Sequence, residues 1–115
     1  MLCVFRTQQN GGYGQSMVAG VAPDAVGQAI TGTFYNPQVN AFDPYYGQAQ
    51  PDMTNFDNWG FFTQTVWKAT QQIGCYSVDC SSKGGLQGKP AGSSDDFTVC
   101  NYWPAGMFNF LMCSC

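Results

Sequence analysis

Six cysteines in a chain of 115 residues constrain the fold of this protein more than any other feature. An even number of cysteines in a small, glycine-rich chain is typical of a disulfide framework formed in an oxidising compartment. A metal site is less favoured, because Cys75 and Cys80 are spaced C-x4-C, Cys113 and Cys115 are spaced C-x-C, and no C-x2-C pair occurs. The spacing of the cysteines does not choose among the possible disulfide pairings.

The chain contains neither histidine nor glutamate, and all of its acidic residues are aspartates. No histidine of this chain can therefore act as a general base or a metal ligand, and a Ser-His-Asp or Cys-His catalytic unit cannot be built from it. A zinc site would need cysteine and aspartate alone, which is an uncommon ligand set. The sequence therefore predicts no metal, no other cofactor and no hydrolytic catalysis.

Charged residues make up 10% of the chain and aromatic residues 16%, which is typical of globular protein rather than of a disordered chain. The formal net charge is −3, and the basic residues are scattered, whereas nucleic acids and anionic membranes select clustered positive charge. No stretch approaches the roughly 20 apolar residues of a membrane span. We therefore expect no nucleic-acid partner and no transmembrane segment.

The first half of the chain alternates between loop-like and helical patterns. Residues 8–20 are rich in Gln, Asn and Gly and predict a loop. A helix is expected from Pro23 to just before Pro37, with Val26, Ile30 and Phe34 on one apolar stripe. Residues 38–57 predict a long ordered loop or lid. In the aromatic run 58–68, Trp59, Phe62 and Val66 would share a helical face.

The second half of the chain predicts two strands and the connection between them. Residues 71–79 and 97–103 have strand patterns and are expected to pair antiparallel, while the polar and glycine-rich residues 81–96 form a turn-rich connection. The adjacent carboxylates Asp95 and Asp96 lie in that connection and predict a solvated turn rather than an acid–base pair. The fold class predicted for the whole chain is α+β with a small antiparallel sheet.

Three stretches carry a family resemblance: GFFTQTVWK at residues 60–68 followed by IGC at 73–75, CNYWPAG at 100–106, and GYGQ at 12–15. Taken together they resemble the CAP superfamily, which comprises the cysteine-rich secretory, antigen-five and pathogenesis-related class-one proteins. Residues 34–42 and 46–53 look most like fungal members. The resemblance covers residues 3–107 as one CAP (SCP) domain and leaves residues 108–115 as a divergent C-terminal tail.

The resemblance implies an α-β-α sandwich that is secreted and disulfide-bonded, so the chain is expected to be extracellular. It also implies that Cys3 pairs with Cys75 and that Cys80 pairs with Cys100. Residues 1–15 lack the apolar stretch of a signal peptide. Nothing in the sequence matches the family's first helix, so we expect that about the first third of the usual domain is missing.

The family's central cavity holds two histidines and two acidic residues, and the resemblance places three of those positions here. The second histidine position holds Phe61, one glutamate position holds Gln15, and the other holds Gln38, or Pro37 if the register slips. We expect a vestigial cavity that has lost its ion-binding chemistry, because glutamine keeps the shape of glutamate without its charge. Ordinary loop polarity is the alternative interpretation of Gln15 and Gln38.

Some family members bind sterols through an aromatic loop, and others hold fatty acids. The corresponding loop here contains Phe42, Tyr45, Tyr46 and Phe56, whose rings suit an amphipathic ligand. The competing interpretation, that these rings merely cover the core, is the commoner situation in a small domain.

The resemblance predicts a non-enzymatic secreted protein that binds a sterol, a fatty acid, or a host or cell-surface protein. Two alternatives stay open at this point. In the first alternative, the chain is a non-functional fragment of a CAP protein. In the second, which is less favoured, it is a protease-like member of the family.

Overall fold

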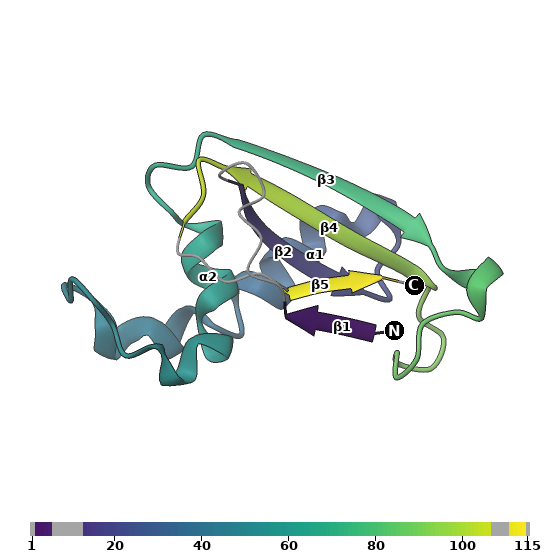
Figure 1. Ribbon diagram of the computed structural model, residues 1–115, viewed down its shortest axis with the longest axis horizontal. Helices are drawn as coiled ribbons and strands as arrows, with labels where there is room; N and C mark the ends of the chain where they lie inside the picture. The colour runs from purple at the N-terminus through teal and green to yellow at the C-terminus, as the bar shows by residue number, and fades with distance from the viewer. Residues whose placement is uncertain (1, 6–12, 107–110, 115) are drawn as a thin grey trace.

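A computed structural model describes residues 2–5, 13–106 and 111–114 of the chain. Its centre is a three-stranded antiparallel sheet with the strand order β2-β4-β3 (Figure 1). Strand β4 (Asp96–Trp103) lies between β2 (Gly14–Ala19) and β3 (Gln72–Asp79). The predicted antiparallel pairing of residues 71–79 with 97–103 is confirmed, and so is the α+β class.

The prediction of a loop over residues 8–20 is wrong for the part that the structure describes as β2. Within β2, Ser16 and Val18 face one side of the sheet, whereas Met17 and Ala19 face the other. The local composition, rich in glycine and glutamine, gives little strand signal. The strand forms because its backbone pairs with β4, which lies far along the chain: Gly14 pairs with Tyr102 and Ala19 with Phe97.

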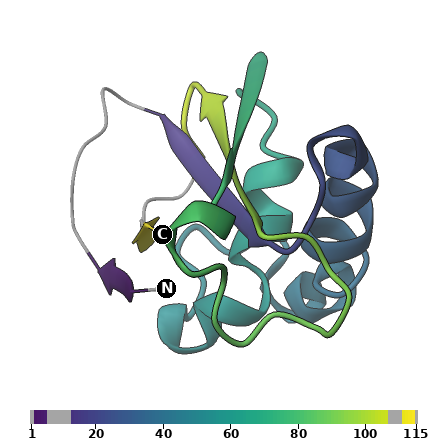
Figure 2. The ribbon, with the colours of Figure 1, turned by 90° about the vertical axis from the view of Figure 1, so that its right-hand side faces the viewer.

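A second, two-stranded antiparallel pair joins the two ends of the described chain. Strand β1 (Leu2–Phe5) pairs with β5 (Leu111–Ser114), and Cys3 lies opposite Cys113 in the register. The sequence patterns predicted neither strand. Figure 2 shows this pair on one side of the three-stranded sheet and the helices α1 and α2 on the other.

The helix predicted between Pro23 and Pro37 is present as three consecutive helical segments. The 3-10 turn η1 (Pro23–Ala25) leads into α1 (Val26–Ala29) and then into the π-helical segment η2 (Ile30–Tyr35). Of the predicted apolar stripe, Phe34 is buried, whereas Val26 and Ile30 are only half-buried. Pro23 is accommodated because the first turn of a helix needs no amide donor there.

The predicted long loop contains two more short helices. These are η3 (Val39–Tyr45) and η4 (Met53–Asn58), and they lead to α2 (Gly60–Thr65). Trp59 and Phe62 are buried and Val66 is exposed, so the three residues predicted to share a helical face do not do so. The reason is that α2 ends at Thr65, so the backbone of Val66 no longer follows the helix. In the connection between β3 and β4, residues 81–83 form the 3-10 turn η5 (Ser81–Lys83).

The two faces of the three-stranded sheet are packed differently. Ser16, Thr98, Cys100 and Tyr102 point toward the helices, and all four are buried. On the opposite face, Phe97, Leu86 and Cys80 form a buried cluster against which Met17, Ala19 and Val99 pack. These opposed faces follow from the two-residue alternation of strands.

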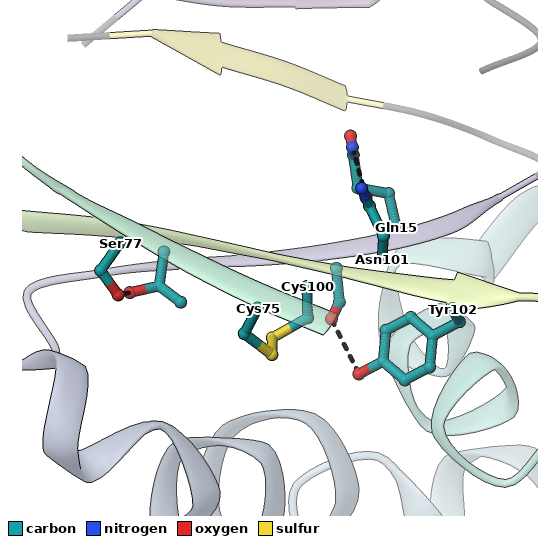
Figure 3. Close-up of a disulfide and its surroundings, with 8 residues drawn as sticks. Gln15, Cys75, Ser77, Cys100, Asn101 and Tyr102 are labelled. Carbon is teal, nitrogen blue, oxygen red and sulfur yellow. Dashed lines mark hydrogen bonds between the residues drawn. A yellow bond between two sulfur atoms is a disulfide. The ribbon is translucent and has the colours of Figure 1, made fainter. Parts of the chain in front are cut away.

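The disulfide pairing predicted from the resemblance is wrong. Cys75 is bonded to Cys100 (Figure 3), so neither Cys3–Cys75 nor Cys80–Cys100 is formed. The register of β3 and β4 places Cys75 directly opposite Cys100, with their Cα atoms 4.1 Å apart. Cys80 lies beside Asp95, about five strand residues or roughly 17 Å from Cys100, beyond the reach of a disulfide. Cys80 takes part in a disulfide of its own.

Candidate functional site

Four aromatic rings from three consecutive segments form a cluster that we call the Trp59 cluster: Phe42, Tyr45, Phe56 and Trp59. The ring centroids of Phe42, Tyr45 and Phe56 lie 5.1, 5.6 and 4.9 Å from that of Trp59. Trp59 is 0% exposed, whereas the other three rings are partly exposed. Edge-to-face and tilted contacts at these distances are favourable for aromatic pairs.

The Trp59 cluster contains a buried donor without an acceptor. The indole Nε1–H of Trp59 is enclosed and has no hydrogen-bond partner among the described residues. A buried tryptophan normally finds a partner for this group, because leaving it unpaired costs about 1–3 kcal/mol. Sequence reasoning placed Trp59 on a helical face and missed this orphan donor, which only the packing around the ring reveals.

All four residues of the predicted lipid-binding loop come together in or beside the Trp59 cluster. The fourth of them, Tyr46, follows η3, and its ring centroid lies 5.1 Å from that of Phe42. Tyr46 is 61% exposed. The loop therefore has an inner part, which covers Trp59, and an outer tyrosine that faces solvent.

Gln38 serves the start of α2 with both ends of its side-chain amide. Its Oε1 accepts the Phe62 N–H at 3.0 Å, and its Nε2 donates to the Asp57 carbonyl at 3.0 Å. The side chain is 9% exposed. The amide thus satisfies one of the amide donors that a helix leaves open at its first turn.

Phe61 lies on α2, and its ring centroid is 5.0 Å from that of Phe34. Gln15 belongs to β2, and its Nε2 donates to the Asn101 Oδ1 at 2.8 Å. This pair projects from the face of the sheet opposite the helices, as Figure 3 shows. The structure therefore brings Gln38 and Phe61 together near the start of α2 and leaves Gln15 on the other face.

Gln64 is a buried polar residue that sequence reasoning missed. Its Oε1 accepts the Gly106 N–H at 3.0 Å, and a methyl group at Gly14 would overlap its amide. Gly14 and Gly106 both belong to stretches that carried the family resemblance. The signal that was available is a glutamine in the middle of an aromatic helix, since a buried amide there needs close backbone partners.

The buried hydroxyl groups are engaged with one another or with the backbone. Ser16 Oγ and Tyr102 Oη are 3.0 Å apart, and Ser77 Oγ and Thr98 Oγ1 are 2.6 Å apart. Thr63 Oγ1 donates to the Gly60 carbonyl. None of these contacts supplies the base that a serine or threonine nucleophile needs. Among the described residues, no group of three or more His, Cys, Asp or Glu side chains is placed to hold a metal ion.

Asp95 and Asp96 do not act as a pair. Asp95 Oδ1 lies 2.8 Å from Lys89 Nζ and accepts the Leu86 N–H at 2.9 Å. The hydrogen bond from Lys89, followed by the one from Leu86, lowers the pKa of Asp95 below its ordinary value of 3.8. Hydrogen bonds from Thr54 and Ser81 lower the pKa of Asp52 and Asp79 in the same way. Each of these carboxylates accepts a hydrogen bond from a nearby backbone N–H and thereby stabilises a turn.

The lowered pKa of Asp95 predicts a pH-dependent contribution to stability. Its folded-state pKa lies below the unfolded one, so the contribution is present above pH 3.8 and is lost as the pH falls through the folded-state value. Asp95→Asn should melt at a lower temperature than the wild type at pH 7, and the difference in melting temperature should narrow as the pH falls below 3.8. Asp43→Asn, at an exposed position, is the control variant. A gap of constant size across this range would contradict the assignment.

No helix of the described chain combines the length and the apolar character that a membrane crossing requires.

Comparison with known proteins gives several significant relatives, although no family model matches the chain. A probable pathogenesis-related protein of Arthroderma benhamiae is 41% identical over 96 residues, which is 84% of this chain and 29% of the relative. A Candida albicans protein described as secreted is 29% identical over 90% of this chain and 24% of its own length. Venom allergen 5 of Polybia paulista is 38% identical over 45% of this chain and 21% of its length. The chain spans less than a third of each of these relatives.

Proposed function

The chain belongs to the CAP superfamily, and from that membership we propose that it is an extracellular, non-enzymatic protein that binds a sterol at the Trp59 cluster. A relative described as secreted and the disulfide between Cys75 and Cys100 support the extracellular location. We further propose that residues 3–107 correspond to part of the family's α-β-α sandwich and residues 108–115 to a divergent tail.

The orphan indole N–H of Trp59 is the observation that carries the proposal. A donor enclosed by aromatic rings is satisfied best by a ligand that is mostly apolar and carries one oxygen acceptor. A sterol has that chemistry, because its rings can replace the contacts of Phe42 and Tyr45 while its hydroxyl oxygen accepts from Trp59 Nε1. The unliganded cluster therefore lacks an acceptor that the ligand supplies.

The aromatic side chains around Trp59 also provide a route of entry. Phe42 and Tyr45 belong to η3, and the segment that follows Tyr46 up to residue 50 is exposed. Short 3-10 segments have poorer hydrogen-bond geometry than α-helices and are easier to displace. We expect the ligand to enter by moving Phe42 and the exposed Tyr46 away from Trp59.

The non-enzymatic part of the proposal depends on residue types. The chain has no histidine, and Phe61 stands where the resemblance places the family's second histidine. Gln15 and Gln38 stand where it places the two glutamates, and amides carry no charge to attract a divalent cation. Gln38 is moreover occupied by the backbone of Asp57 and Phe62. A metal-dependent hydrolytic site is therefore not proposed.

The test is binding of the fluorescent sterol dehydroergosterol to the wild type and to Trp59→Phe. The phenylalanine keeps an aromatic ring in the cluster but removes the N–H together with the five-membered ring of the indole. Because the oxygen of the ligand then loses its donor, the apparent Kd should rise about fivefold to tenfold, equivalent to about 1–1.4 kcal/mol. Trp103→Phe is the matched control, because Trp103 is 41% exposed and lies on β4 outside the cluster. The control should bind like the wild type.

A second variant tests the wall of the site. Phe42→Ala combined with Tyr45→Ala and Tyr46→Ala should abolish measurable sterol binding if these rings enclose the ligand. Equal binding by this variant and by the wild type, or no binding by either, rejects the sterol site. Displacement of the bound probe by oleate at equal concentration would reassign the cluster to fatty acids, which also carry an oxygen acceptor.

A further inference from the structure

Strand β3 forms the open edge of the three-stranded sheet. Its only strand neighbour in the described chain is β4, and Figure 1 shows it along the outer margin of the sheet. Apolar side chains are exposed along it: Ile73 is 52% exposed and Tyr76 is 78% exposed, and Val78 is exposed as well. An eight-residue edge of this kind is longer than most strands and is a template for pairing with another chain.

The hydrogen-bonding pattern shows which backbone groups of β3 point outward. The Cys80 N–H donates to the Asp95 carbonyl at 2.9 Å, and the close Cα approach of Cys75 and Cys100 marks a non-hydrogen-bonded pair. Residues alternate along an antiparallel ladder, so the odd-numbered positions from Ile73 to Asp79 direct their N–H and C=O groups away from β4. Four residues therefore offer unpaired donors and acceptors at the edge.

The usual protections of an edge strand are missing from β3. It contains no proline and no lysine, and its only charged residue is Asp79 at the end. Edge strands of monomeric proteins generally carry such residues, or a bulge, to prevent pairing. The continuous register from Gln72 to Asp79 has no bulge.

We propose that two copies of this chain associate through β3, which pairs antiparallel with β3 of the second copy. With Cys75 opposite Cys75 of the second copy, each Tyr76 faces a Gly74 of the other copy. Gly74 has open space where a side chain would project, and an aromatic ring over an edge glycine is a favourable cross-strand contact. In this register Asp79 lies opposite Gln71, so no like charges meet. The pairing is thus self-complementary, as a twofold interface requires.

The test is sedimentation equilibrium of the disulfide-bonded chain over a range of concentrations. The wild type should show a reversible monomer–dimer equilibrium. Ile73→Pro removes an outward N–H but no bond to β4, and the dimer dissociation constant should rise about tenfold or more. Ile73→Ala removes most of the same side chain and keeps the N–H, so its dissociation constant should stay within about threefold of the wild type.

A charge at Tyr76 gives an independent variant that leaves the β3 backbone intact. Tyr76→Lys alters a side chain that is mostly exposed, so the fold should persist, and the dimer dissociation constant should again rise about tenfold. Tyr46→Lys, at an exposed site off the sheet, is the matched control and should not change the equilibrium. A wild type that is monomeric up to about millimolar concentration overturns the proposal, as does a dimer that both Ile73→Pro and Tyr76→Lys leave unchanged.

Discussion

Trp59→Ala is expected to lower the free energy of unfolding by about 3–5 kcal/mol, because the indole is fully enclosed and its removal leaves a large cavity. Contacts with Phe42, Tyr45 and Phe56 would be lost together. A domain of this size has a total stability of roughly 5–15 kcal/mol, so this loss is a large fraction of it. Urea denaturation followed by circular dichroism measures the difference.

Two variants separate this effect from the loss of an ordinary aromatic residue. Trp103→Ala removes the same side chain from an exposed position and should cost less than about 1 kcal/mol. Trp59→Phe removes the orphan N–H and fills much of the space, so it should be considerably milder than Trp59→Ala. If Trp59→Ala cost no more than Trp103→Ala, the Trp59 cluster would not be part of the core.

The two variants of Trp59 also distinguish stability from binding. The indole ring fills the core, and in the proposed function its N–H gains an acceptor when the sterol binds. A substitution that keeps the ring should therefore leave the unliganded protein folded and weaken sterol binding. One side chain can affect both stability and binding because its apolar ring needs close packing, whereas its N–H needs a hydrogen-bond acceptor.

The elements that local periodicity describes could be predicted from the sequence. The apolar stripe between Pro23 and Pro37 predicted a helical segment that is observed from Pro23 to Tyr35. Alternation over residues 71–79 and 97–103 predicted β3, β4 and their antiparallel pairing. The buried residues of the helical segment and of β4 lie near one another in the chain, so a local pattern can predict these elements, whereas β3 stays mostly exposed.

The elements that depend on distant partners could not be predicted in this way. Strand β2 has a weak local pattern and is fixed by β4, and β1 pairs with β5 at the opposite end of the described chain. Gln64 is held by Gly106, far from it in the sequence. The local propensity of the residues for helix or strand does not predict such contacts, because they depend on partners that are distant in the sequence.

The candidate site was predicted in part. The four aromatic residues between Phe42 and Phe56 were identified from the resemblance, and the structure places them in or beside one cluster. The orphan donor at the centre was not foreseen, since it depends on how three segments pack around one ring. Gln15, Gln38 and Phe61 are grouped by the resemblance alone, which does not indicate that Gln15 projects from the face of the sheet opposite the helices.

Replacing both Cys75 and Cys100 with serine is expected to lower the free energy of unfolding by about 3 kcal/mol. The bond closes a segment with a sequence separation of 25, and opening it restores conformational freedom to the unfolded chain. Urea denaturation of the double variant and the wild type under non-reducing conditions gives the difference. Tyr76→Ser, at an exposed position next to Cys75, should cost less than about 1 kcal/mol.

The single variant Cys100→Ser tests the pairing itself. With Cys75 as the partner of Cys100, the substitution leaves the thiol of Cys75 free, and alkylation followed by peptide mapping should find the label on that residue. The pairing implied by the family resemblance would instead release the thiol of Cys80. The observed pairing is favoured because antiparallel strands place Cys75 and Cys100 directly opposite each other, whereas Cys80 lies beyond the reach of a disulfide from Cys100. Labelling of Cys80 in Cys100→Ser would therefore reject the register of β3 and β4 together with the disulfide.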